Sequence, residues 1–133
     1  MILTVDIGNT NIVFGCVEDG RVIAKGRIAT NRSDLTNDYY LRLRQMFEIE
    51  DIDYRMIEGA IISSVVPQIV PLIKGAVKKL MGIDCMVVGM GIKTGMNIKI
   101  DDPGTLGADL ITTAVGAVSK YSKPLVIVDM GTA

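Results

Sequence analysis

Residues 1–29 read MILTVDIGNTNIVFGCVEDGRVIAKGRIA, and this stretch decides the fold. It holds three strand-like segments, Ile2 to Ile7, Asn11 to Val17 and Arg21 to Ala29. Apolar and β-branched residues dominate the first two, and apolar and basic residues alternate along the third. The turn Gly8-Asn9-Thr10 and the pair Asp19-Gly20, which favours a tight hairpin, separate them. The stretch predicts a three-stranded antiparallel meander.

The spacing of apolar residues becomes helical after residue 33. It predicts a helix over Asp34 to Phe47, with Ser33 or Thr36 available as its cap. The later elements are a strand from Ala60 to Val66, a helix from Ile69 to Leu80 that ends at Gly82, a strand from Cys85 to Val88, a helix beginning near Thr105 and marked by Leu110 to Val118, and a last strand from Leu125 to Asp129. The order βββ-α-β-α-β-α-β predicts an α/β fold in which right-handed crossovers pair the later strands in parallel.

The chain stops at Val128-Asp129-Met130-Gly131-Thr132-Ala133, directly after an apolar strand pattern. A strand followed by Gly-Thr is typical of the start of a phosphate-binding turn. We therefore expect residues 1–133 to be the first lobe of a two-lobed protein, with the second lobe missing after Ala133. The exposed apolar surface would then be meant for that half or for a partner subunit.

Composition excludes several classes of function. Lys and Arg number 14 and Asp and Glu 15, for a net charge of −1, and no basic block indicates nucleic acid or an anionic membrane as the main partner. Histidine is absent, which excludes a Ser-His-Asp triad, a Cys-His dyad and histidine-ligated zinc. Carboxylates are therefore the leading candidates for any acid–base chemistry.

The sequence also bears on location. No apolar run approaches the roughly 18 residues of a membrane span, and Asp6 and Asn9 interrupt the N-terminus too early for a signal peptide. Cys16 and Cys85 lie far apart in apolar runs, which is typical of buried, reduced thiols rather than of a disulfide or a metal site. We expect a cytoplasmic protein.

Aspartates beside glycines are the strongest chemical signal. They occur in Asp6-Ile7-Gly8 and in Asp129-Met130-Gly131-Thr132, and a single motif of this kind is more often an ordinary turn. Two of them, one on the first hairpin and one after the last strand, favour phosphate handling. Glycine lets backbone N–H groups approach an anion, and an adjacent Asp can hold the Mg²⁺ that bridges to phosphates.

Asp109 follows Gly107-Ala108 near the start of the third predicted helix. It is either a residue that complements the helix dipole or a general base that takes a proton from a substrate hydroxyl during phosphoryl transfer. Both interpretations stay open at this point. Ser63-Ser64 is expected to cap the next helix rather than act as a nucleophile, because no histidine base is available. The residues Lys74, Lys78 and Lys79 are expected to form a solvated helix face.

Five motifs together resemble the type III pantothenate kinases of the acetate kinase/actin/Hsp70 superfamily. They are Asp6-Ile7-Gly8-Asn9-Thr10-Asn11, Ser63-Ser64-Val65-Val66-Pro67, Gly91-Ile92-Lys93-Thr94-Gly95-Met96, Asp102-Pro103 with Gly107-Ala108-Asp109, and Asp129-Met130-Gly131-Thr132-Ala133. The resemblance covers the whole chain, but only about the first half of a usual member. It implies a ribonuclease H-like fold, a homodimer, and transfer of a phosphoryl group from ATP to the 4′-hydroxyl of pantothenate, the first step of coenzyme A synthesis.

The resemblance also implies roles for individual residues. ATP would be bound by Asp6, Ile7, Gly8, Asn9, Thr10, Asn11, Ile12, Val13 and Thr132. Pantothenate would be bound by Ile100, Gly107, Ala108, Asp109 and Leu110, with Asp109 as the proton acceptor. Mg²⁺ is the implied divalent ion, with Asp6 as its ligand, and a monovalent cation (K⁺ or NH₄⁺) would be held by Asp129.

Two positions depart from the family pattern, which has Arg in place of Leu110 and Tyr in place of Ile100. A hydrogen bond to a charged group contributes roughly 1.5–3 kcal/mol, so loss of the Arg predicts about ten- to hundredfold weaker substrate binding. The main alternative is therefore a catalytically idle relative that serves as a nucleotide-binding or regulatory dimeric scaffold. A sugar or acetate kinase of the same superfamily is a third reading.

Overall fold

The computed structural model describes residues 1–89 and 92–130. Within them the strands are β1 (Ile2–Ile7), β2 (Asn11–Glu18), β3 (Arg21–Ala29), β4 (Gly59–Ser64) and β5 (Cys85–Val87). The α-helices are α1 (Thr36–Ile49), α2 (Val70–Met81) and α3 (Ala108–Lys120), and short 3-10 helices cover Tyr54–Met56 and Pro103–Thr105. The elements follow one another as predicted as far as the third α-helix, with bounds that differ by a few residues.

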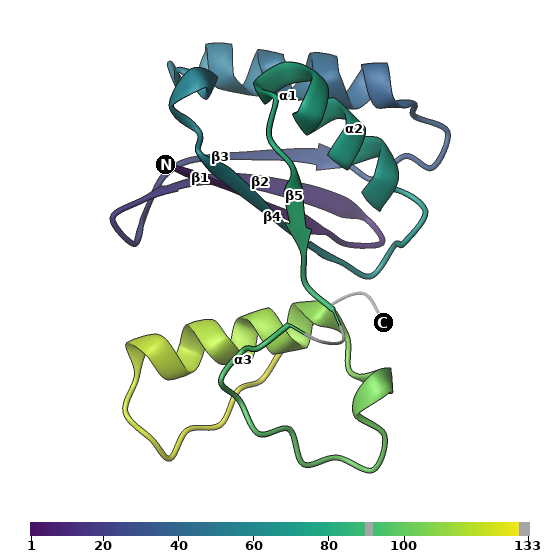
Figure 1. Ribbon diagram of the computed structural model, residues 1–133. Helices are drawn as coiled ribbons and strands as arrows, with labels where there is room; N and C mark the ends of the chain where they lie inside the picture. The colour runs from purple at the N-terminus through teal and green to yellow at the C-terminus, as the bar shows by residue number, and fades with distance from the viewer. Residues whose placement is uncertain (90–91, 131–133) are drawn as a thin grey trace.

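The strands form one mixed sheet in the order β3-β2-β1-β4-β5 (Figure 1). The pairs β1–β2 and β2–β3 are antiparallel, whereas β1–β4 and β4–β5 are parallel. The hairpin between β2 and β3 turns at Asp19 and Gly20, which both have positive φ, at 49° and 74°. The predicted α/β class, with a three-stranded antiparallel meander followed by alternating helices and parallel strands, is confirmed as far as α3.

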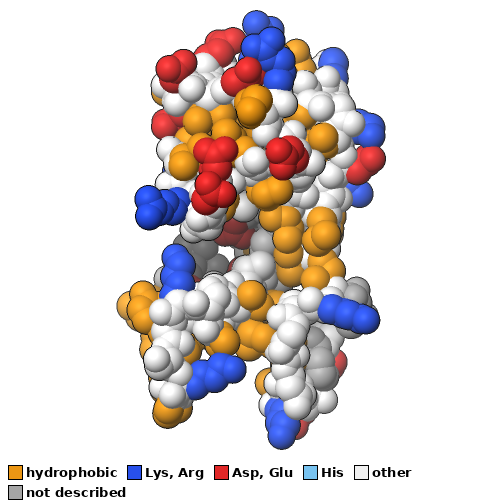
Figure 2. Space-filling model, turned by 60° about the vertical axis from the view of Figure 1, so that its left-hand side comes forward, with side chains coloured by type: hydrophobic (Ala, Val, Ile, Leu, Met, Phe, Trp, Pro, Cys, Tyr) orange, Lys and Arg blue, Asp and Glu red, His pale blue; other side chains and the backbone are white. Residues whose placement is uncertain are grey.

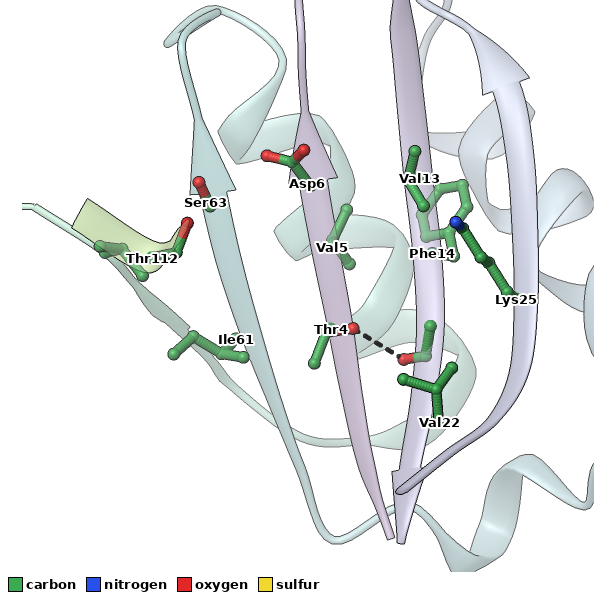
Figure 3. Close-up of a pocket in the computed structure, with 12 residues that line it drawn as sticks. Thr4, Val5, Asp6, Val13, Phe14, Val22, Lys25, Ile61, Ser63 and Thr112 are labelled. Atoms are coloured by element: carbon green, nitrogen blue, oxygen red, sulfur yellow. Dashed lines mark hydrogen bonds between the residues drawn. The ribbon is translucent and has the colours of Figure 1, made fainter. Parts of the chain in front are cut away.

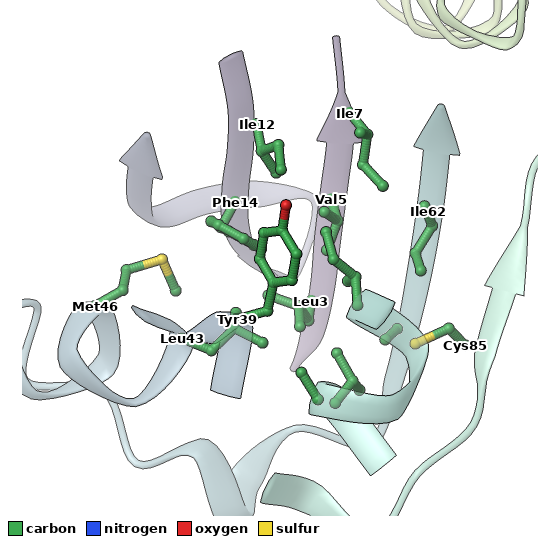
Figure 4. Packing of buried hydrophobic residues seen from close by; sticks show 14 of the residues in the cluster. Leu3, Val5, Ile7, Ile12, Phe14, Tyr39, Leu43, Met46, Ile62 and Cys85 are labelled. Atoms are coloured by element: carbon green, nitrogen blue, oxygen red, sulfur yellow. The ribbon is translucent and has the colours of Figure 1, made fainter. Parts of the chain in front are cut away.

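One face of the sheet carries the hydrophobic core. Side chains alternate along β1, so Leu3, Val5 and Ile7 are at most 2% exposed and lie on the side covered by α1 and α2 (Figure 4). Gly26 of β3 permits the close approach of α1, because a Cβ atom there would lie 2.6 Å from the Sδ atom of Met46. An added methyl group at Gly26 would therefore force the Met46 side chain to move.

The sequence predicted how α2 ends and how α1 is capped, and only the first prediction is confirmed. α2 ends at Gly82 in a left-handed conformation with φ of 75°, as predicted. The cap of α1 is neither Ser33 nor Thr36. Its N-cap is Leu35, whose backbone N–H donates to Oδ2 of Asp38 at 2.7 Å. The cap prediction was wrong because the acceptor comes from the first turn of the helix and not from the residue that precedes it.

Predictions about the thiols and the lysines are confirmed. Cys16 and Cys85 are free and buried, and desolvation by burial raises the pKa of both thiols. The side chains of Lys74, Lys78 and Lys79 are exposed on α2. The two thiols therefore belong to the core, and the three lysines face solvent.

α3 lies on the opposite side of the sheet from α1 and α2 and meets the sheet through β4 (Figure 1). It begins at Ala108 rather than near Thr105, because Pro103–Thr105 form a separate 3-10 turn. None of its described side chains is buried, and the surface is hollowed between the sheet and the part that contains α3, with apolar side chains at the border (Figure 2). Neither α3 nor another helix in the described ranges is long and apolar enough to cross a membrane.

The predicted strand from Leu125 to Asp129 does not form in the structure. Val126 and Val128 are 91% and 78% exposed. A β-strand needs a neighbour to satisfy its backbone N–H and C=O groups, and none of the five strands of the sheet pairs with this segment. Apolar, β-branched composition was therefore not sufficient to make a strand here.

Candidate active site

The turn after β1 is held closed by its own backbone. The N–H of Gly8 donates to the carbonyl of Asn11 at 2.9 Å, and the Oγ1 hydroxyl of Thr30 donates to the carbonyl of Gly8 at 2.7 Å. A Cβ atom at Gly8 would lie 3.1 Å from the oxygen of Asn11, so glycine permits this close turn. The Gly8-Asn9-Thr10 stretch thus sits at a fixed place at the end of β1, with Asn9 and Thr10 exposed.

Strand alternation divides the predicted ATP loop, Asp6 to Val13, between two faces of the sheet. Ile7 and Ile12 are fully buried in the core, so only their backbones can reach a ligand. Asp6 and Val13 are cross-strand partners and both point to the other face, the one toward α3. Of the predicted loop, the structure offers Asp6, Val13 and the turn between them to that face.

Two aspartates that are far from Asp6 in the sequence, Asp109 and Asp129, come within electrostatic reach of it. The pKa of the Asp6 carboxyl is raised above its ordinary 3.8, first by desolvation and then by the negative charges of Asp109 and Asp129. The side chain of Ser63 acts in the opposite direction and lowers this pKa. Asp6 remains in contact with solvent, so the carboxylate is crowded by neighbours without being enclosed. These are the aspartates that the sequence selected.

The N-terminus of α3 holds Asp109 in a defined position. Oδ1 of Asp109 accepts a hydrogen bond from the N–H of Leu110 at 2.9 Å, and its carbonyl accepts one from Oγ1 of Thr112 at 2.9 Å. A Cβ atom at Gly107 would collide with Oδ1 of Asp109 and also touch Val65. Gly107 is therefore needed for space around the Asp109 carboxylate, and not for its backbone angles.

A cavity of about 340 Å³ lies on the sheet face opposite the core (Figure 3). Asp6 of β1 and Ser63 of β4 line it together with Thr112 of α3, and Val13 and Ile61 contribute apolar walls. Its surface is mainly apolar, with the polar groups gathered where β1 and β4 end. Such a cavity, apolar with a few convergent polar groups, is typical of a ligand site.

Sequence reasoning selected Asp6 and Val13 of this cavity and missed its other polar side chains, which are Thr4, Lys25, Ser63 and Thr112. Lys25 pairs with Gly15, which pairs with Thr4, so all three lie on the face that carries Asp6. The period-two pattern of β3 placed Lys25 on the face opposite Ala24, and that signal could have found it. Ser63 needed the parallel register of β1 and β4, which the sequence does not contain.

A second cavity of about 300 Å³ lies beside the first turns of α3. Leu110 and Asp129 line it, with Ile111, Thr113 and Met96. The structure thus brings together Asp129 and Leu110, which the sequence placed in different subsites. It does not bring Ile100 there, because Ile100 is 44% exposed and lies outside the walls of both cavities.

The donor atoms present fit a divalent ion that arrives with a nucleotide. In the described ranges no three His, Cys, Asp or Glu side chains are close enough to hold a metal by themselves. Mg²⁺ is usually bound through one or two carboxylates plus substrate phosphates and water, which does not require three. Asp6 offers one such carboxylate, and beside it the buried Oγ atom of Ser63 has no hydrogen-bond partner.

Two further predictions concern Ser64 and Thr132. Ser64 accepts a hydrogen bond from the N–H of Val66 at 2.9 Å, so it closes the turn before α2, although α2 itself begins only at Val70. Thr132, the predicted ATP contact after Asp129, lies outside the described residues, as do Gly131 and Gly91. Those predictions stay predictions.

The sequence was compared with known proteins. The profile of a family described as Type III pantothenate kinase matches residues 2–133. A protein from Bifidobacterium animalis subsp. lactis named "Type III pantothenate kinase" is 44% identical over 133 residues, which is 100% of this chain and 53% of that protein. The chain therefore spans about half the length of this curated relative.

Among solved structures, a ROK hexokinase from Thermus thermophilus is similar with a TM-score of 0.49 and 12% sequence identity. The similarity covers 65% of this chain and 32% of the hexokinase.

Proposed function

Because this chain belongs to the type III pantothenate kinase family, we propose that it forms the nucleotide- and acceptor-binding part of an enzyme that phosphorylates pantothenate. The reaction transfers the γ-phosphoryl group of ATP to the 4′-hydroxyl and gives 4′-phosphopantothenate and ADP, the first step of coenzyme A biosynthesis. ATP and pantothenate are the proposed substrates, and neither nucleic acid nor a membrane is a proposed partner.

The convergence of Asp6, Asp109 and Asp129 is the observation that carries this proposal. They come from the end of β1, the first turn of α3 and the segment after α3, yet both later carboxylates act on the pKa of Asp6. Gathering like charges costs folding free energy, and such clusters are typical of functional sites. A Mg²⁺-bound triphosphate is a ligand whose charges would suit them.

Each carboxylate has a separate role in the proposed mechanism. Asp109 accepts the proton of the 4′-hydroxyl as that oxygen bonds to the γ-phosphorus. The bond from the γ-phosphorus to the β–γ bridging oxygen breaks, and ADP leaves. When bound, Mg²⁺ supplies neutralisation of phosphate charge, and Asp6 would hold it. Asp129 would hold the monovalent cation, K⁺ or NH₄⁺.

The turn from Asp6 to Val13 would place the phosphates, with Thr132 as a further contact. Gly107, Ala108, Asp109 and Leu110 would border pantothenate. This follows the second cavity, which Leu110 lines, and the half-buried positions of Gly107, Ala108 and Asp109 at the start of α3. Ile100 has the weakest support among the proposed pantothenate contacts, because it lines neither cavity.

The organisation of the whole enzyme is also a proposal. Residues 1–133 would be its N-terminal ribonuclease H-like lobe, followed by a second lobe, and the enzyme would be a cytoplasmic homodimer. The relative from Bifidobacterium, nearly twice as long as this chain, supports the two-lobed arrangement.

A coupled ADP-release assay tests the activity in the longest natural form of this chain, with and without pantothenate and K⁺. Asp109→Asn should abolish nearly all pantothenate-dependent ADP release. The matched control is Asp84→Asn, because Asp84 is an exposed carboxylate paired only with Lys78 at 2.9 Å, and loss of that pair should leave turnover unchanged. Undiminished turnover of Asp109→Asn would discard the base assignment.

The second candidate function, an idle nucleotide-binding scaffold, rests on Leu110 and Ile100. Both are aliphatic and about equally exposed, at 43% and 44%, so neither supplies a polar contact to pantothenate. Separate binding measurements discriminate the two functions. Binding of Mg·ATP with no response to pantothenate would favour the scaffold, whereas binding of both would favour the kinase.

A further inference from the structure

The hydroxyl group of Ser63 is an unexplained buried donor. Ser63 is only 7% exposed, and its Oγ atom has no hydrogen-bond partner in the described structure. Buried polar atoms without a partner are rare in native proteins, and each one calls for an explanation such as a ligand that is bound in function.

The other hydroxyl groups that line the 340 Å³ cavity have hydrogen-bond partners, unlike that of Ser63. Thr4 donates to the carbonyl of Gly15 at 3.1 Å, and Thr112 donates to the carbonyl of Asp109 at 2.9 Å. Of the three hydroxyl side chains that line the cavity, Ser63 alone keeps its proton available.

Ser63 is placed beside Asp6 by the register of the sheet. The two residues are direct partners in the parallel pair β1–β4, so their side chains lie on the same face and point into the cavity together (Figure 3). As a side-chain hydrogen-bond donor, the nearby Ser63 hydroxyl lowers the pKa of Asp6, while its Oγ atom falls just outside full hydrogen-bond geometry with the described residues.

We propose that Ser63 is a positioning residue, whose hydroxyl donates to one carboxylate oxygen of Asp6 and leaves the other oxygen to bind Mg·ATP. This rests on the proposed role of Asp6 at the nucleotide. The fixed donor offsets the crowding by Asp109 and Asp129, which otherwise leaves the carboxylate without an orienting partner. Partners of this kind behind a metal-binding group commonly change affinity by about 10- to 100-fold.

The test is calorimetric Mg·ATP binding to the Ser63→Ala variant in the longest natural form of the chain. The dissociation constant should rise about tenfold or more, while the KM for pantothenate stays the same. Thermal stability should be equal or higher, because the substitution removes an unpaired buried hydroxyl. Ser63→Thr restores the hydroxyl and should restore most of the affinity. A merely structural role would instead lower stability and leave binding intact.

Ser64→Ala is the matched control. Ser64 is the neighbouring serine, and its hydroxyl already accepts from the N–H of Val66, so its removal should lower stability and leave Mg·ATP affinity alone. The double variant Asp6→Asn/Ser63→Ala then separates positioning from direct contact. If Ser63 acts through Asp6, the second substitution adds no further loss of affinity.

Three outcomes would overturn the inference: unchanged Mg·ATP affinity in Ser63→Ala, an equal loss in the Asp6→Asn background, or a natural form that does not bind Mg·ATP. The proposed function fails separately if the natural form binds Mg·ATP yet releases no ADP in response to pantothenate. In that case the comparison of Ser63→Ala with Ser64→Ala still decides the role of Ser63.

Discussion

Substitution of Gly107 by Ala should damage the reaction far more than the fold. The added Cβ atom would collide with Oδ1 of Asp109, closer than real Cβ atoms approach an oxygen, while its nearest contact outside Asp109 is Val65 at an ordinary 3.9 Å. The Asp109 carboxylate must therefore move, on the order of 1 Å, and a displacement of that size at a reacting group costs about a hundredfold in rate. The kcat for pantothenate-dependent ADP release should fall by that factor.

The control for this prediction lies on the same helix. Gly116 of α3 has nothing within 4 Å of an added Cβ, so Gly116→Ala should raise helix stability by about 0.5–1 kcal/mol with kcat unchanged. Steady-state kinetics and thermal unfolding of both variants make the comparison. If Gly107→Ala keeps its kcat within a factor of two, the carboxylate does not need the space that the structure reserves for it.

Three further changes test the packing and the charges. Gly26→Ala places a Cβ 2.6 Å from Sδ of Met46 and should destabilise the fold by about 1–3 kcal/mol, seen as a lower urea midpoint; an unchanged midpoint would contradict the packing described. Asp34 is 7% exposed, pairs with Arg42 at 3.0 Å and accepts a hydrogen bond from Asn31 at 2.6 Å, so Asp34→Ala removes both contacts and should cost about 1.5–3 kcal/mol in urea unfolding; an unchanged midpoint would contradict their contribution. Asp6 has a raised pKa, so the folded state holds its proton to a higher pH than the unfolded state does, and stability falls as pH rises above the ordinary 3.8. Asp6→Asn should therefore raise the Tm at neutral pH and lose that gain toward pH 3.8; a Tm gain that is the same at both pH values would contradict it.

Local signals in the sequence predicted local structure well. The Asp19-Gly20 turn and the end of α2 at Gly82 need backbone conformations with positive φ, which favour those residue types directly. The cap of α1 was missed because Asp38 competes with Ser33 and Thr36 through a bond that closes only once the helix has formed. Pairing partners are the harder part, since a segment such as Leu125 to Asp129 becomes a strand only beside another strand.

At the candidate site, too, local signals were predicted from the sequence, whereas contacts between distant segments were not. Glycine and aspartate motifs selected Asp6, Asp109 and Asp129 from the sequence, because each stands beside a glycine at the border of a predicted strand or helix. That Asp109 and Asp129 act on Asp6 depends on how α3 is placed against β4, which no local pattern encodes. Ser63 was missed for a similar reason. It lies at the site because of the parallel register of β1 and β4, two strands more than fifty residues apart in the sequence.

The end of β1 and the first turn of α3 should meet at a single nucleotide site. NMR of the isotope-labelled chain with Mn²⁺·ATP in place of Mg²⁺·ATP can detect this, because Mn²⁺ broadens the signals of nearby nuclei. The amide signals of Gly8, Ser63 and Asp109 should broaden together, while that of Asp84, which follows α2, should stay sharp. Broadening that leaves Gly8 and Asp109 untouched would contradict it.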